Sequence, residues 1–224
     1  MGMRIGLVSD IHGNRVALEA VLEEMATVDK LLCAGDVVGY NPWPAACVDE
    51  LRERDVPTVM GNHDAAVVEG DASGFNRMAR AGVEHASEQL DDGQLAWLES
   101  LPTERLACDD RVKVVHGHPD DPTRYTRYTR PSEFSPRLLD EEDVLVLGHT
   151  HVQSVEQYAE GIVVNPGSVG QPRDGDPRAG YAVVDLEAMT VDTYRVEYDL
   201  EAVQNAVADA GLPDRIGHRL ARGK

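Results

Sequence analysis

Lysine is nearly absent from this chain of 224 residues, occurring at positions 30, 113 and 224, so most of its 21 basic residues are arginines. The 40 acidic residues outnumber them and give a net charge of -19. Binding to long nucleic acids or anionic membranes requires a stripe of clustered basic residues that displaces counterions, and this chain has no such stripe. We therefore expect it to bind neither. The acidic, lysine-poor composition favours a cytoplasm of high salt, where screening relieves self-repulsion, with an ordinary acidic protein as the alternative.

Cysteine is also scarce: Cys33, Cys47 and Cys108 are odd in number and form no CxxC pair. This pattern argues against a disulfide framework or a structural zinc knuckle, so we expect reduced core residues. Apolar runs long enough to cross a membrane are lacking, because Asp10 interrupts the first one. We therefore expect a cytoplasmic protein. Its length suits one core and no segment has linker composition, which predicts a single domain over residues 1–224.

Short apolar or β-branched runs that end in Gly, Asn or Asp predict buried strands followed by loops. We expect such strands at Arg4 to Ser9, Lys30 to Ala34, Pro57 to Met60, Val112 to Val115 and Val144 to Leu147. Helical periodicity predicts helices around Leu18 to Met25, at Trp43 to Arg54, two within residues 75–100, and a last one at Leu200 to Ala210. The alternation of strand and helix over the first 60 residues indicates a parallel sheet with right-handed crossovers.

The pattern changes after His151. Short strands separated by Gly-rich turns are expected at Val155 to Tyr158, Ile162 to Val164, Tyr181 to Asp185 and Val191 to Val196. Such a succession predicts antiparallel pairing in a second sheet.

Polar residues follow five of the apolar runs. The motifs are Ser9-Asp10-Ile11-His12, Gly35-Asp36, Gly61-Asn62-His63-Asp64, Val115-His116-Gly117 and Gly148-His149-Thr150-His151. In open α/β sheets ligands collect beyond the carboxyl ends of the strands, so these loops should converge. Carboxylate, amide and imidazole groups bind divalent metals of hard to borderline character, and the five motifs therefore predict a metal site.

These motifs, in this order, resemble those of calcineurin-like metallophosphoesterases over residues 8–151. The later Asn165-Pro166-Gly167-Ser168-Val169 is similar to a segment of the family's small prokaryotic phosphodiesterase-like members. The resemblance implies an α/β fold, a four-layer α/β/β/α sandwich of two mixed β-sheets flanked by helices. It also implies a metal-dependent phosphoesterase acting on small phosphodiesters or phosphomonoesters, with a nucleotide phosphatase as an alternative.

The resemblance further implies which residues bind metal. It assigns Asp10, His12 and His151 to a first ion and Asn62, His116 and His149 to a second, with Asp36 bridging them. Two divalent ions are implied, Mn²⁺ first, with Fe, Zn, Ni or Co as alternatives. Such ions, about 3.5–4 Å apart, share a hydroxide that attacks in line. His63 is implied to stabilise the phosphoryl oxygens and to protonate the leaving group.

Two departures from the family concern the neighbourhood of Asp36. The family's protein phosphatases have an acidic residue that orients the catalytic histidine where Gly39 stands here, followed by an arginine where Tyr40 stands. The His-Asp dyad is therefore not expected, and the resemblance to protein phosphatases is weak. His118 could compete with His116 as a ligand, and we choose His116 because it directly follows an apolar run. His85 and His218 are expected at the surface.

Two further alternatives stay open. The segment Arg124-Tyr125-Thr126-Arg127-Tyr128-Thr129-Arg130 could contact substrate phosphate or form a solvated loop. Some proteins of this fold are scaffolds that bind a protein partner and have lost activity, whereas the presence of His63 favours an enzyme with a small phosphate ester as its partner. A homodimer is also possible.

Overall fold

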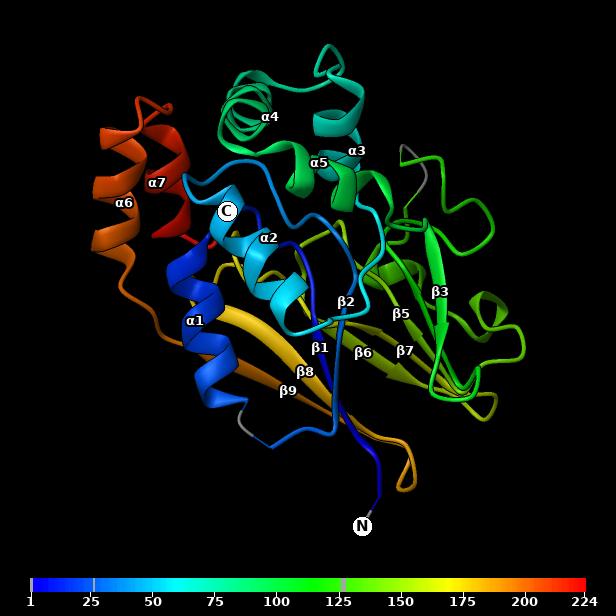
Figure 1. Ribbon diagram of the computed structural model, residues 1–224. Helices are drawn as coiled ribbons and strands as arrows, with labels where there is room; N and C mark the ends of the chain where they lie inside the picture. The colour runs from blue at the N-terminus through cyan, green and yellow to red at the C-terminus, as the bar shows by residue number, and fades with distance from the viewer. Residues whose placement is uncertain (1, 26, 126–127) are drawn as a thin grey trace.

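The computed structural model describes residues 2–25, 27–125 and 128–224, and it contains two mixed β-sheets packed face to face (Figure 1). The first sheet has the order β2 (Lys30–Cys33), β1 (Arg4–Val8), β8 (Ala179–Asp185) and β9 (Thr190–Val196). The second has the order β3 (Glu104–Ala107), β4 (Val112–Val115), β5 (Val144–Val146), β7 (Ile162–Asn165) and β6 (Ser154–Gln157).

A buried apolar layer joins the facing surfaces of the two sheets. Ile5 and Leu7 of β1 belong to the same cluster as Val114 of β4 and Val146 of β5. These side chains are at most 1% exposed. Alternate residues of β1 face this layer, as the period of two in a strand requires.

Helices cover both outer faces. Over the first sheet, α1 (Arg15–Glu24) and α2 (Pro44–Glu53) share a core with β8 (Figure 1). On the outer face of the second sheet, the short 3-10 helix η2 (Pro136–Leu138) packs together with Phe134, which follows a second 3-10 helix, η1 (Pro131–Glu133). The remaining helices are α3 (Asn62–Glu69), α4 (Arg77–Gln89), α5 (Asp92–Glu99), α6 (Leu200–Asp209) and α7 (Arg215–Leu220). The predicted four-layer α/β/β/α sandwich is confirmed, with a thin fourth layer.

The sheet pairing corrects one prediction. The four late strands do not form a sheet of their own: β8 and β9 join β1 and β2, whereas β6 and β7 join β3, β4 and β5. One edge of β1 pairs in parallel with β2 and the other pairs with β8 in the antiparallel sense. The predicted antiparallel pairing is confirmed for β6 with β7 and for β8 with β9, but the expected common sheet is wrong. Hydrophobic alternation identifies a strand and its buried face, but it does not identify a partner distant in sequence.

The strand expected at Pro57 to Met60 is also wrong. This segment makes an isolated parallel bridge between Cys33 and Thr58. Pro57 has no N–H to donate, and the Met60 N–H donates to the Pro102 carbonyl at 2.8 Å instead of to a strand.

Three elements were not predicted from the sequence: β3, α3 and α7. Because α7 follows α6, the helix predicted at Leu200 to Ala210 is not the last one. Over the described residues, no helix combines the length and apolar character needed to cross a membrane.

Candidate metal centre

The five polar loops meet where strands of both sheets end. Asp10 and Asp36 follow β1 and β2 of the first sheet, and His116 and His149 follow β4 and β5 of the second. Hydrogen bonds tie the loops together: Asp10 N–H donates to the Gly35 carbonyl at 2.9 Å, and His149 N–H donates to Asp10 Oδ2 at 3.1 Å. The site therefore lies between the ends of the two sheets rather than at the end of a single sheet.

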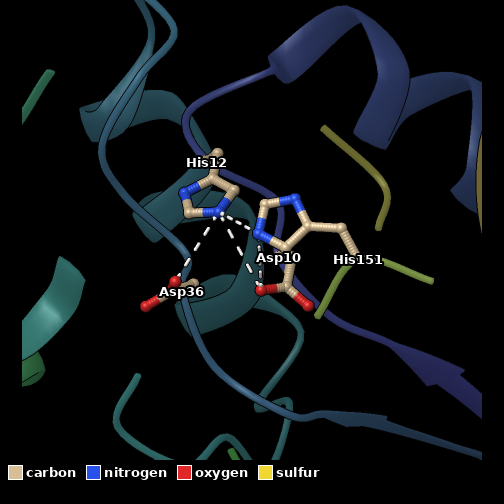
Figure 2. A group of neighbouring side chains, drawn as sticks. All are labelled: Asp10, His12, Asp36 and His151. Carbon is tan, nitrogen blue, oxygen red and sulfur yellow. Dashed lines mark hydrogen bonds and ion pairs between the residues drawn. The ribbon is translucent and has the colours of Figure 1, made fainter. Parts of the chain in front are cut away.

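A first group of donors consists of Asp10, His12, Asp36 and His151, all buried (Figure 2). One donor atom from each lies within 4.8 Å of the others. The Nε2 atoms of His12 and His151 are 3.1 Å apart, and Asp10 Oδ1 lies 3.3 Å from Nε2 of His151. Three donor atoms, two from the loop after β1 and one from the loop after β5, thus lie close together.

A second group of donors lies on the other side of Asp36. Asn62 Oδ1 is 2.8 Å from Nδ1 of His149 and 3.1 Å from Nε2 of His116. Those two imidazole nitrogens are 3.3 Å from each other. Asn62 is the first residue of α3, which directs its side chain toward the loops after β4 and β5.

Asp36 contacts both groups. Its Oδ2 atom lies 3.6 Å from Nε2 of His12 and 3.4 Å from Nε2 of His116. Its other oxygen, Oδ1, accepts a hydrogen bond from the His63 N–H at the N-terminus of α3, at 2.8 Å. A Cβ atom at Gly61 would collide with this carboxylate, so glycine is needed there. Asp36 stands where a carboxylate shared by two ions would stand.

Backbone carbonyls orient three of the four imidazoles. Nδ1 of His12, His116 and His151 lies 3.1, 2.7 and 2.6 Å from the carbonyl oxygens of Val38, Ala34 and Gln171. A carbonyl can only accept, so Nδ1 carries the proton and Nε2 is directed into the site. Such carbonyl partners fix the tautomer that binds metal through Nε2.

Burial sets the charges of the first group. It lowers the pKa of His12 and His151 well below the ordinary range, so both rings are neutral donors. Burial raises the pKa of Asp10 to about 7, and His116 only partly offsets this. Asp10 Oδ1 is buried and accepts no hydrogen bond from any described residue. A divalent cation among these donors would compensate the Asp10 charge and use the imidazole lone pairs, so the donor set fits such an ion.

The backbone of the site is strained. Asp10, His12, Asp36, His149 and His151 have positive φ angles, between 49° and 66°, although none is glycine. Each such residue costs about 1–3 kcal/mol, and strain of this kind collects at functional sites. Five of the seven expected ligands therefore hold a conformation that packing alone would not select.

Comparison with known proteins decides the family. The model of the calcineurin-like phosphoesterase superfamily domain matches residues 3–189. The chain belongs to this superfamily. Phosphodiesterase YfcE of Escherichia coli is 29% identical over 202 residues, covering 84% of this chain and 91% of that protein. The crystal structure of a metallophosphoesterase from Sphaerobacter thermophilus has a TM-score of 0.85 and 36% identity, and all of both chains is covered.

An uncharacterized protein of Methanocaldococcus jannaschii is 30% identical over 98% of both chains. Superfamily membership and the buried Asp/His cluster together make this chain a metal-dependent phosphoesterase. The resemblance seen in the five sequence motifs is confirmed over nearly the whole chain.

His63 differs from its counterpart in the superfamily's protein phosphatases in how it is held. Its Nδ1 atom is buried and has no hydrogen-bond partner among the described residues. A Cβ atom on Gly39 would lie 2.5 Å from Nδ1, so the acidic side chain of those phosphatases has no room here. The rings of His12, Tyr40 and Phe75 surround the imidazole, with centroids 4.7, 4.8 and 4.7 Å away. Burial lowers the pKa of His63 to about 4.

Two residues that the sequence did not single out complete the site. The Gln171 carbonyl accepts from His151, while its side-chain oxygen accepts from Nη2 of Arg173 at 2.7 Å. Nη2 of Arg173 also donates to the Tyr40 hydroxyl at 3.2 Å. One feature of the sequence indicated their role, which is that they directly follow the Asn165 to Val169 motif. Ser168 of this motif donates a hydrogen bond to the Asp10 carbonyl in the loop after β1.

The other polar residues considered from the sequence lie outside the two donor groups. Nδ1 of His118 accepts from the Asp120 N–H at 3.2 Å. His218 is exposed as expected, whereas His85 is half-buried, with Nε2 3.2 Å from the Pro42 carbonyl. Within the Arg124 to Arg130 segment, Thr126 and Arg127 lie outside the described residues.

Proposed function

We propose that this phosphoesterase hydrolyses small phosphodiesters by in-line displacement at a centre of two divalent ions. The observation that carries the proposal is the meeting of two donor groups at one carboxylate, Asp36. Asp10, His12 and His151 would bind one ion and Asn62, His116 and His149 the other. The similarity to phosphodiesterase YfcE supports diesters over monoesters.

The bound ions would activate water as a nucleophile at neutral pH and neutralise charge on the phosphoryl oxygens. The mixed nitrogen and oxygen donors suit Mn²⁺, and Fe, Zn, Ni or Co as alternatives. Asp36 would keep the ions close, because its carboxylate is charged at all working pH values. Burial opposes that charge, but the neighbouring histidines, His116 most strongly, outweigh burial and hold the pKa of Asp36 well below its usual value.

His63 would donate a hydrogen bond to the phosphoryl group and to the leaving oxygen. Its Nδ1 faces Gly39, so Nε2 is the atom free to meet substrate in the cavity that His63 lines. With a pKa near 4 the ring is neutral at pH 7 and carries one N–H. Its contribution should therefore be small for good leaving groups and larger for alkoxides.

The first test is an assay of metal-free protein with Mn²⁺, Zn²⁺ or Ni²⁺ added back, on bis-p-nitrophenyl phosphate and p-nitrophenyl phosphate, at low and high salt. Metal-dependent turnover of the diester, reduced by His63→Ala with metal content unchanged, supports the proposal. Preference for the monoester would replace it with a nucleotide or sugar phosphatase. No turnover with both ions bound would favour a scaffold.

A cytoplasmic location and a homodimer accompany this proposal as expectations from the sequence. Cell fractionation tests the first and analytical ultracentrifugation tests the second. Among the described residues the large hydrophobic side chains that are exposed are Met3 and Leu106.

A further inference from the structure

Two cavities adjoin the metal centre and share part of their walls. The smaller, of about 190 Å³, contains His63, Tyr40 and Phe75 in its lining. The larger, of about 450 Å³, contains Tyr128, Arg130 and Val152. His149 and Arg173 line both, so the two cavities adjoin at these residues.

A phosphodiester has two ester arms, and this geometry gives each arm a separate place. The leaving arm belongs beside His63, the group proposed to donate to the leaving oxygen. The retained arm must then project elsewhere from the same phosphorus. The larger cavity is the place available for it next to the shared residues, whereas a phosphomonoester would leave it without an occupant.

The lining of the larger cavity is aromatic and cationic. The Tyr128 ring lies 4.6 Å from the His149 ring, and Arg130 lies over it with Cζ 5.3 Å from the centroid. Nη2 of Arg130 donates to the Tyr128 hydroxyl at 3.0 Å. In the described parts of the chain, neither Arg130 nor Arg173 has a side-chain carboxylate within ion-pair distance, although the net charge is -19.

Two arginines without carboxylate partners among the described residues therefore line one cavity of a strongly acidic protein. Neutral groups position them: Gln171 and Tyr40 bind Arg173, and Tyr128 binds Arg130. Their charges remain available to a ligand that is anionic or carries a π face. Nucleobases stack on tyrosine rings and on guanidinium planes, and phosphate oxygens suit an arginine fork.

We propose that the larger cavity binds the retained arm of a phosphodiester, and that this arm is a nucleoside. The inference rests on the proposed phosphodiesterase function and names its substrate class. Water adds to phosphorus, the bond from phosphorus to the leaving oxygen breaks, and that oxygen takes up a proton. The product held by Tyr128 and Arg130 is then a nucleoside monophosphate.

The test compares three substrates that all release p-nitrophenolate: p-nitrophenyl phosphate, methyl p-nitrophenyl phosphate and the p-nitrophenyl ester of thymidine 5′-phosphate. The leaving group is constant, so differences in kcat/KM report the retained arm. Stacking of one base is worth about 5- to 150-fold, and we expect the thymidine ester to exceed the methyl ester in this range. Most of the difference should appear in KM.

Variants locate the preference. Arg130→Ala and Tyr128→Ala should each lower the ratio of thymidine to methyl ester by about fivefold or more, whereas Tyr128→Phe keeps the ring and should keep most of the ratio. Arg137→Ala is the matched control, because Arg137 is exposed on η2 and lines neither cavity.

The outcomes distinguish the two proposals. Absence of turnover of all three substrates by metal-loaded wild-type protein would reject the proposed function. Turnover with equal kcat/KM for the methyl and thymidine esters would reject the nucleoside arm while leaving the phosphodiesterase intact. A thymidine preference that survives both Arg130→Ala and Tyr128→Ala would place the nucleoside outside this cavity.

Discussion

At the scale of single residues, His63 is positioned by ring contacts and by a glycine, and no carboxylate pairs with its buried nitrogen among the described residues. A carboxylate partner raises the pKa of a histidine and helps it to carry a proton. Here burial lowers that pKa to about 4, so in the proposed mechanism the ring would act as a neutral hydrogen-bond donor. In the proposed mechanism the metal ions would then neutralise most of the charge on the phosphoryl oxygens.

Gly39→Ala tests this packing. The new Cβ would lie 2.5 Å from His63 Nδ1, so the ring must move, and we expect kcat to fall by at least about tenfold, as small misplacements of catalytic groups do. The measurement is steady-state hydrolysis of bis-p-nitrophenyl phosphate at saturating Mn²⁺.

Gly175→Ala is the matched control, because Gly175 has φ 89°, close to the 91° of Gly39, but no atom within 4 Å of an added Cβ. Both variants should lose about 1 kcal/mol of stability from the left-handed backbone. Equal activity of the two variants would show that the Gly39 contact does not position His63.

Arg173 also acts at this scale. Its guanidinium is bound by neutral acceptors and borders both cavities beside the metal centre. Arg173→Ala should lower kcat/KM for diesters about 100-fold, because a positive charge beside the substrate phosphate would be lost, and Arg173→Lys should recover only part of it. Metal content by plasma mass spectrometry should be unchanged. Loss of bound metal in Arg173→Ala would instead assign Arg173 a structural role.

At the scale of the elements, strand ends made the site predictable. Asp10, Asp36, His116 and His149 each follow a buried run, and such runs are recognisable from composition alone. Asn62 follows no strand and starts α3 instead, so its assignment came from the family motif. The pairing of β8 with β1 could not be predicted, because the residues of a strand do not show which distant strand will pair with its edge.

The second cavity escaped prediction for a related reason. Arg173 and Tyr128 are far apart in sequence. They line the same cavity because Tyr128 lies in the loop after β4 and Arg173 lies in the loop after β7. The sequence showed the Arg-Tyr repeat of residues 124–130 but left its role open. Only the placement of Tyr128 against His149 distinguishes a cavity wall from a solvated loop.

Asn14 couples an element to the site. Its Oδ1 caps α1 by accepting from the Ala17 N–H at 3.1 Å, and its Nδ2 donates to the Gly170 carbonyl at 3.1 Å, beside Gln171. Asn14→Ala should lower the free energy of unfolding by about 2–3 kcal/mol, since it removes a cap and a buried hydrogen bond. Urea denaturation measures this loss.

Asn76→Ala is the control for Asn14, because Asn76 caps α4 at an exposed position. It should cost about 1 kcal/mol. Asn14→Asp keeps the capping oxygen but places a buried carboxylate oxygen against the Gly170 carbonyl, so it should be at least as destabilising as Asn14→Ala. If Asn14→Ala costs no more than Asn76→Ala, the link to Gly170 does not contribute.

At the scale of the whole molecule, protons and metal ions compete for the same buried centre. Burial raises the pKa of Asp10 to about 7, while Asp36 outweighs burial and raises the pKa of His116 to about 10. Both groups hold protons at pH 6, and a metal ion must displace them. Ion binding should therefore strengthen as the pH rises.

The expected result is an Mn²⁺ affinity at least about tenfold higher at pH 8 than at pH 6, with protons released on binding. Competition with a chromophoric chelator gives the affinity, and calorimetry in buffers of different ionisation enthalpy gives the proton count. An affinity independent of pH, with no proton release, would mean that these two groups do not bind the ion.

The most direct test of the two-ion centre is an anomalous difference map from a crystal of the Mn²⁺-loaded protein. We predict two peaks, one beside Asp10, His12 and His151 and one beside Asn62, His116 and His149, about 3.5–4 Å apart with Asp36 between them. A single peak, or peaks away from Asp36, would contradict the account.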